Sequence, residues 1–112
     1  MPRLSELLKN QVSLPVPYRG AVITVVYKPE SVNPDVNAAI QARVDKKEIE
    51  ARHSDAAFLA EVITSWDLND DNDAPYPVTF EVMKARSTSL QLALIAAIYD
   101  DQRNPQNPPQ GN

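Results

Sequence analysis

The first regular pattern in the chain is an alternation of side-chain types in the segment VSLPVPY, residues 12–18. One side of this segment carries only apolar and aromatic side chains, namely Val12, Leu14, Val16 and Tyr18. This period of two predicts a half-buried strand, and since Pro15 and Pro17 have no N–H to donate, we expect an edge strand or one whose prolines face away from its partner. A short Arg19–Gly20 turn leads into a β-branched run over residues 21–28, so the pattern predicts a β-hairpin.

A different period begins after the hairpin. Asn33 can cap a helix, and Pro34 suits the first helical position. The apolar residues that follow recur every four positions, at Val36, Ile40 and Val44. Residues 45–53 are almost wholly charged, and Ile49 lies well off that stripe, so we expect the helix to end or to leave the core in this window.

The strongest core pattern lies in the next segment. Ser54 and Asp55 predict a new helix start. Its broad apolar face consists of Phe58, Leu59, Val62, Ile63 and Trp66. The opposite side carries Glu61, Thr64 and Ser65. The pattern predicts one amphipathic helix that ends with Trp66 in the core.

Two more helices are predicted near the C-terminus. Thr79 can cap a short helix over residues 80–86, and Ser87 or Thr88 can cap a longer one that runs to about Asp101. At roughly 100° per residue, one side of the longer helix consists of Leu90, Leu94, Ala97 and Ile98. The nearly opposite side consists of Leu92, Ile95 and Tyr99. A small domain usually buries one side of such a helix, so the second side predicts a surface for a partner or for self-association; complete burial in the monomer is the alternative.

The length of 112 residues is that of one small domain. Two strands alone are marginally stable in water, so the hairpin needs other elements to pack on. We therefore expect an α+β, mainly α fold, with an N-terminal β-hairpin packed on a small helical domain of about four helices. This domain should span residues 12–101, after a flexible or short helical N-terminus (1–11) and before a disordered, proline-rich tail (102–112).

The most apolar stretch, LQLALIAAIY at residues 90–99, has only about half of the roughly 20 residues that a bilayer-spanning helix needs. The first ten residues interleave charges with leucines and lack the apolar centre of a signal peptide. We therefore expect a soluble, cytoplasmic protein. The chain has no cysteine, which excludes disulfides, thiolate metal sites and cysteine nucleophiles.

An acidic segment, SWDLNDDNDAPYPVT, connects the apolar helices. Four of its residues match the first, third, fifth and seventh places of a calcium loop, namely Asp67, Asn69, Asp71 and Asp73. Asn72 stands at the sixth place, where glycine is favoured, and Val78 at the twelfth, where a glutamate is needed. We interpret the segment as a solvated turn without a metal, with a calcium-modulated binding module as the alternative. Tyr76, held between two prolines, either points outward to a partner or packs on Trp66.

Enzyme chemistry has little support in the sequence. His53 is the only histidine, and its charged surroundings predict an exposed helix residue. No nucleophile elbow, glycine-rich phosphate loop or metal-ligand pair is present, so we expect no enzyme and no cofactor. The net charge of -4 and the scattered basic residues argue against nucleic-acid binding. A small helix-turn-helix DNA-binding regulator, formed by the last two helices, is the second alternative. The second of these helices is apolar, and Gln91 is the one side chain on it that could contact a base or a phosphate.

A set of short segments, taken in order, resembles the tail assembly chaperones of long-tailed, siphovirus-type bacteriophages. These segments are VPYRG, ITVVYKP, VITSWDLNDD, PYPVTFEVM and LQLALIAAIYDD. The likeness covers most of residues 12–101. The chain departs from the family pattern where its acidic turn lacks a glycine and where KARSTSL replaces a more apolar junction.

The resemblance implies a non-enzymatic assembly factor for virion morphogenesis. Such a factor coats the tape measure protein, recruits tail tube subunits around it, and leaves before the tail is complete. It implies protein–protein interaction in the cytoplasm of the bacterial host, a possible homo-oligomer, and absence from the mature virion. With the helix pattern, it makes Tyr76, Leu92, Ile95 and Tyr99 the candidate partner-binding residues.

Overall fold

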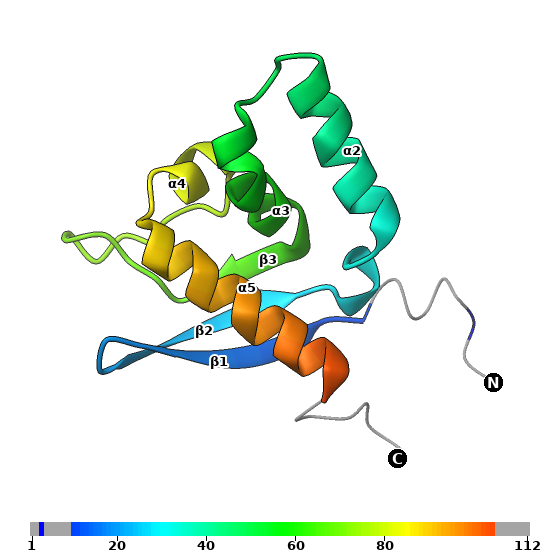
Figure 1. Ribbon diagram of the computed structural model, residues 1–112. Coiled ribbons are helices and arrows are strands. Elements are labelled where there is room, and N and C mark those ends of the chain that lie inside the picture. Colours follow the sequence, from blue (N-terminus) through cyan, green and yellow to red (C-terminus); the bar gives the residue numbers. More distant parts are fainter. Residues whose placement is uncertain (1–2, 4–9, 105–112) are drawn as a thin grey trace.

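The computed structural model describes residue 3 and residues 10–104. Its elements are β1 (Val12–Tyr18), β2 (Ala21–Tyr27), the 3-10 turn η1 (Pro29–Ser31), α2 (Pro34–Asp45), the 3-10 turn η2 (Ala51–His53), α3 (Ser54–Val62), β3 (Ile63–Trp66), α4 (Phe80–Lys84) and α5 (Thr88–Arg103). The helices lie over one face of a three-stranded antiparallel sheet of order β1-β2-β3 (Figure 1). The predicted α+β class, with an N-terminal hairpin and four α-helices in the described part of the chain, is confirmed. The predictions for residues 1–2, 4–9 and 105–112 lie outside the described residues.

The hairpin forms as predicted, with β1 at the edge of the sheet. Arg19 and Gly20 both have positive φ, at 50° and 82°, as a tight two-residue turn requires. Tyr18 pairs with Ala21 beside this turn, and hydrogen-bonded pairs then alternate along the ladder. Pro15 and Pro17 occupy the other positions, so their nitrogens face the open edge and remove no bond from the ladder.

The predicted helix from Ser54 to Trp66 is wrong in its last turn. Helix α3 ends at Val62, and Ile63–Trp66 form β3, which pairs with β2. The run Val62-Ile63-Thr64 is β-branched and suits an extended backbone, and the free edge of β2 supplies its hydrogen-bond partners. The Thr64 hydroxyl, for example, donates to the Val26 carbonyl at 3.1 Å. Trp66 is nevertheless buried as predicted, from a strand instead of a helix.

Helix α2 begins and ends close to where the sequence indicates. The Asn33 side chain caps it by accepting from the Val36 N–H at 3.0 Å. The chain leaves the helix after Asp45 and turns at Lys47, whose φ is 61°. The helix therefore ends within the predicted window. The turn brings Ile49 into the core although it lies off the α2 stripe, because its position relative to that stripe no longer matters once the helix has ended.

Helix α5 crosses the sheet and packs against β1 and α3 (Figure 1). Ser87 caps it by accepting from the Leu90 N–H, and Thr79 caps α4 in the same way. The helix continues to Arg103, two residues beyond its predicted end, so residues 102 and 103 belong to the fold and not to the tail. In the described part of the chain, no helix is long and apolar enough to cross a membrane.

Candidate functional site

The outer side of α5 is the clearest apolar surface that the sequence predicted. Leu90, Leu94 and Ile98 are buried against the domain. On the other side, Leu92 is 52% exposed, Tyr99 is 37% exposed, and Ile95 is half-buried. We call Leu92, Ile95 and Tyr99 the α5 ridge. Because these residues are spaced i, i+3 and i+7, they follow one side of the helix over about 10 Å.

A groove lies beside the ridge, between α2, α3 and α5. It has a volume of about 210 Å³ and is lined by Asn37, Ile40, Gln41, Ser54, Asp55, Phe58, Ile95 and Tyr99. The Tyr99 ring stacks on the Phe58 ring, with centroids 5.7 Å apart and planes 8° from parallel. We call this feature the α2–α5 groove. It shares Ile95 and Tyr99 with the α5 ridge, so ridge and groove adjoin one another.

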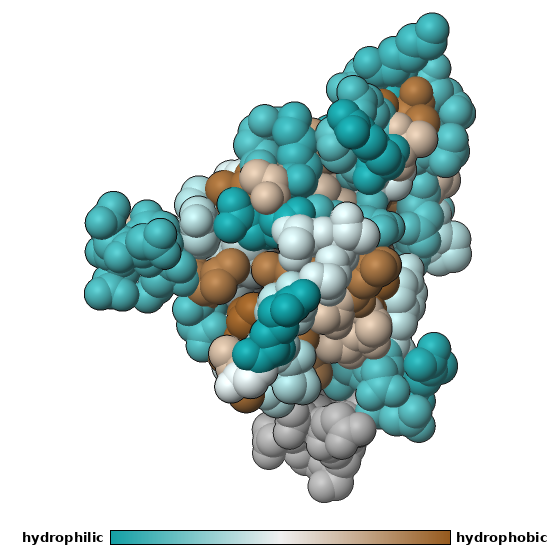
Figure 2. Space-filling view, turned by 60° about the vertical axis from the view of Figure 1, so that its left-hand side comes forward, coloured by the Kyte–Doolittle hydropathy of each residue, from teal (hydrophilic) through white to brown (hydrophobic). Residues whose placement is uncertain are grey.

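Several groups of apolar atoms are exposed on the face drawn in Figure 2. Figure 2 shows brown, hydrophobic atoms in the middle of one face, with hydrophilic projections around its upper and left margins. Surfaces of this kind, apolar inside and polar at the rim, are typical of protein-binding sites.

Tyr76 does not belong to this surface. Its carbonyl accepts a hydrogen bond from Trp66 Nε1 at 2.8 Å, and the Arg86 guanidinium carbon lies 4.5 Å from the centre of its ring. The ring is half-buried against the core, which is closer to the packing interpretation than to an outward-pointing tyrosine. Arg86 precedes α5, whereas Tyr99 is 13 residues further on, or about 20 Å along a helix, so the structure brings together only three of the four candidate residues.

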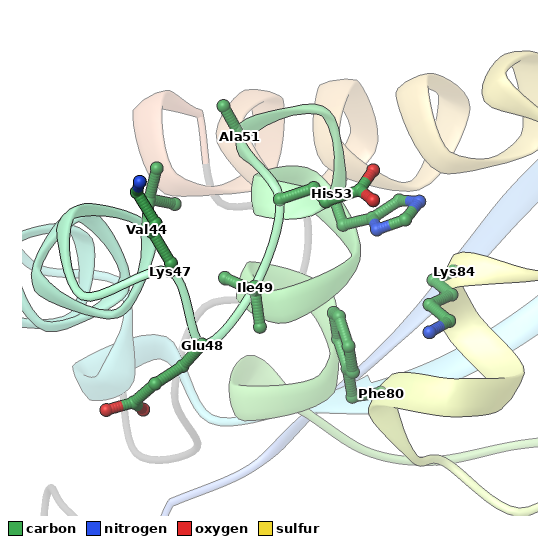
Figure 3. Close-up of a pocket in the computed structure, with 9 residues that line it drawn as sticks. Val44, Lys47, Glu48, Ile49, Ala51, His53, Phe80 and Lys84 are labelled. Carbon is green, nitrogen blue, oxygen red and sulfur yellow. The ribbon is translucent and has the colours of Figure 1, made fainter.

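A second, wider hollow of about 650 Å³ lies between α4 and the connector from α2 to α3 (Figure 3). Its lining consists of Val44, Lys47, Glu48, Ile49, Glu50, Ala51, His53, Phe80 and Lys84. His53 and Phe80 project into it, with ring centroids 6.3 Å apart, while Glu48 points away (Figure 3). His53 is half-buried in η2, so the predicted exposed helix histidine was wrong. Lys84 lies 5.3 Å from the centre of the Phe80 ring.

The charges around this hollow largely neutralise one another. Lys84 is paired with Glu81 at 3.3 Å, and Arg52 is paired with Glu50. The Arg52 guanidinium is the main reason why the pKa of the exposed Glu50 carboxyl lies below its usual value. The sequence offered no sign of this hollow, since it depends on how the connector folds against α4.

The acidic segment forms a local turn. Asp70 Oδ1 accepts from the N–H groups of Asn72 at 2.8 Å and Ala74 at 3.0 Å, and Asp67 Oδ1 accepts from the Thr24 N–H at 2.9 Å. Two of the four aspartates therefore stabilise backbone, as short acidic side chains do in turns. Over residues 3 and 10–104, no group of three or more His, Cys, Asp or Glu side chains is arranged to hold a metal ion.

One polar cluster was not predicted at all. Asp101 is buried near the end of α5, where its carboxylate accepts a hydrogen bond from the buried Tyr27 hydroxyl. Gln102 Nε2 donates to the same hydroxyl at 3.2 Å. Burial first, and then the bond to Asp101, raises the pKa of Tyr27 to about 12. No local pattern could have indicated this pair, because its members are 74 positions apart.

A smaller cluster lies at the other end of α5. The Tyr18 hydroxyl shares hydrogen bonds with the hydroxyls of Ser89 at 2.6 Å and Ser87 at 3.2 Å, and it accepts from Arg19 Nε at 3.3 Å. The Ser87 bond, followed by those of Ser89 and Arg19, lowers the pKa of Tyr18 to about 8. The hairpin is thus hydrogen-bonded to both ends of α5.

Compared with known proteins, the chain matches no family model, no curated protein and no solved structure.

Proposed function

We propose that this protein is a non-enzymatic tail assembly chaperone of a long-tailed bacteriophage, which binds the tape measure protein and recruits tail tube subunits during tail morphogenesis. The observation that carries the proposal is the α5 ridge, a partly exposed apolar side on a helix whose opposite side is core. The order of short segments that resembles this family gives the proposal its direction. The host cytoplasm as its place of action, and its absence from the finished virion, are parts of the same proposal.

A chaperone of this kind has to bind the apolar surface of its client and does not need to catalyse a reaction. A long helical client exposes an amphipathic stripe before it is covered by tube subunits, and such a stripe binds to apolar grooves and ridges through residues spaced i, i+3, i+4 and i+7. The spacing of Leu92, Ile95 and Tyr99 matches that repeat. From Leu92 to Tyr99 the tyrosine hydroxyl is the one polar side-chain group on α5, so the apolar surface is continuous over about two turns of helix.

Neither alternative function gains support from the site. A calcium loop needs carboxylates that converge on one point, whereas Asp67 bonds to β2 and Asp70 bonds within its own turn. A recognition helix needs side chains that contact phosphates and bases, whereas the outer side of α5 carries apolar residues as far as Tyr99.

The test is co-expression with the long helical protein that we expect to be encoded directly downstream. Leu92→Ser combined with Tyr99→Ser should leave the protein folded and should abolish co-purification of that client. The matched control is Val22→Ser, because Val22 is 60% exposed on the hairpin and lies away from α5. Its client binding should equal that of the wild type.

Two results would contradict this proposal. If the double variant unfolds outright, the α5 ridge is core and not a binding surface. If the variant stays folded and still binds the client as the wild type does, the ridge is not the site. Melting curves on the same samples separate these outcomes. Loss of the exposed Leu92 side chain should change the free energy of unfolding by about 0.5 kcal/mol or less, and loss of the Tyr99 ring from its stack on Phe58 should cost about 1–2 kcal/mol, which leaves the domain folded.

A further inference from the structure

The α2–α5 groove has a floor and rims of different chemistry. Its floor is apolar and comes from three helices, with Ile40 on α2, Phe58 on α3 and Ile95 and Tyr99 on α5. Its volume of about 210 Å³ is below the roughly 300 Å³ at which small-molecule pockets begin. The groove therefore has room for one or two side chains of a bound protein segment, and not for a free ligand.

The one charged residue among those that line the groove is acidic. Asp55 lines the groove and is exposed. On α2, Gln41 Nε2 donates to Asp45 Oδ1 at 3.0 Å, which holds this second carboxylate beside the lining residue Gln41. Among the described residues, neither Asp45 nor Asp55 is in an ion pair. Asp100, next to Tyr99, lies 3.8 Å from Arg103 and is thereby partly neutralised.

The two unpaired carboxylates both lie next to the connector that joins α2 to α3. Asp45 is the last residue of α2, and Asp55 is the second residue of α3, with only the connector 46–53 between them. We propose that the α2–α5 groove binds an amphipathic helix of the client that carries a lysine or arginine beside its apolar stripe, at the end facing Asp45 and Asp55. This inference rests on the proposed function, because it specifies the chemistry of the client segment.

The chemistry favours this occupant for two reasons. A lysine or arginine lays its methylene stem along an apolar floor while its charged head stays at the rim, which suits a groove with an apolar centre and acidic end. The net charge of -4 also attracts a cationic partner over a distance. A second copy of this chain would not complement the groove in the same way, since its α5 ridge lies in a stretch without any cation from Thr88 to Tyr99.

Two synthetic peptides test the proposal. Both have about 18 residues, which is long enough for a helix to form in water, and both carry the same leucine stripe. One peptide has lysines flanking the stripe and the other has glutamates. Titration of each into the isotope-labelled protein, followed by NMR, should show tighter binding of the lysine peptide by about tenfold, with the largest shifts at Ile40, Phe58, Ile95 and Tyr99.

Charge reversal gives the discriminating variants. Asp55→Lys should weaken binding of the lysine peptide by about tenfold, because the new lysine repels its lysines. The same variant should bind the glutamate peptide more tightly, because the new lysine attracts its glutamates. Asp71→Lys is the matched control: it changes the net charge by the same amount, and Asp71 is exposed in the acidic turn, outside the groove lining. It should change either affinity by less than about twofold. If Asp55→Lys does not fold, Asp55→Asn should still remove most of the preference for lysine.

Several outcomes would overturn the inference. Equal effects of Asp55→Lys and Asp71→Lys would mean that net charge alone selects the peptide. Equal binding of both peptides would mean that only apolar contact matters. NMR shifts outside the groove would mean that the peptides bind at another surface. Self-association of the protein that the peptides do not reverse would mean that a second copy of the chain occupies the groove. None of these results depends on the co-expression experiment. If the client co-purifies but the two peptides bind equally well, the proposed function is kept and only this inference is refuted.

Discussion

The bond between Tyr27 and Asp101 gives the sharpest test of how the fold is held together. Tyr27 is fully buried on β2, and its hydroxyl donates to a buried carboxylate at the far end of the chain. Tyr27→Phe removes one oxygen atom and keeps the ring that packs in the core. The substitution therefore isolates the hydrogen bond from the hydrophobic contribution of the side chain.

The expected loss follows from the kind of bond. A hydrogen bond to a charged group contributes about 1.5–3 kcal/mol to stability. From the middle of this range we expect a decrease of about 2 kcal/mol in the free energy of unfolding. For a chain of 112 residues, an unfolding entropy of about 2.1 cal/mol/K per residue turns this into a fall in Tm of roughly 8 °C.

The same bond predicts how stability depends on pH. The pKa of Tyr27 is raised to about 12 in the folded protein, against an ordinary value of 10.0. Folding therefore favours the protonated phenol, and its contribution is complete below pH 10 and is lost as the pH rises through 12. Tyr27→Phe has no group to titrate there, so its alkaline loss of stability should be smaller than that of the wild type.

Urea unfolding is the suitable assay, because the chain has one tryptophan and Trp66 is buried in the core. The control is Tyr99→Phe, which keeps the ring stacked on Phe58 and should change stability by less than about 0.5 kcal/mol. Equal stability of Tyr27→Phe and the wild type would refute the reasoning. So would an alkaline loss of the same size in both proteins.

Three other measurements test separate parts of the structure. Phenolate absorbance should show one tyrosine that titrates near pH 8, and Tyr18→Phe should abolish this titration. Because the pKa of Tyr18 is lowered on folding, any stability that its phenolate contributes is present above pH 10 and is lost as the pH falls through 8. Adding millimolar calcium should leave Tm unchanged, since two of the four aspartates of the acidic turn, Asp67 and Asp70, bond to backbone; a rise of several degrees would contradict this. Trp66→Phe should cost about 2–3 kcal/mol in urea unfolding followed by circular dichroism, because it leaves a cavity and an unpaired Tyr76 carbonyl; a cost below about 1 kcal/mol would show that this bond matters little.

The sequence predicts the parts of the fold that depend on local chemistry. The hairpin follows from a period of two and a glycine turn, and the three helix caps at Asn33, Thr79 and Ser87 are all present. The missing element is β3. Its residues continue the helical period of α3, and only the free edge of β2, a tertiary feature, decides in favour of a strand.

The candidate site likewise has one part that local sequence predicts and one part that depends on tertiary structure. The two-sided character of α5 is readable from its sequence, because every residue involved lies on one helix. The α2–α5 groove is not, since it exists only through the placement of α2 and α3 beside Tyr99. For Tyr76 the sequence leaves two interpretations open, and only tertiary contacts favour packing: Arg86 lies over its half-buried ring, and its carbonyl accepts from Trp66.

The position of α5 also bears on how the ridge could bind. Tyr18 ends β1 and bonds to Ser87 and Ser89 at the start of the helix, whereas Tyr27 ends β2 and bonds to Asp101 near its other end. The hairpin therefore fixes both ends of α5, and its inner side is packed in the core between them. A ridge held in this way loses little conformational entropy when a partner binds, which strengthens binding without any added contact. The two hairpin tyrosines are not part of the α5 ridge, yet by fixing both ends of α5 they would favour the binding that we propose for it.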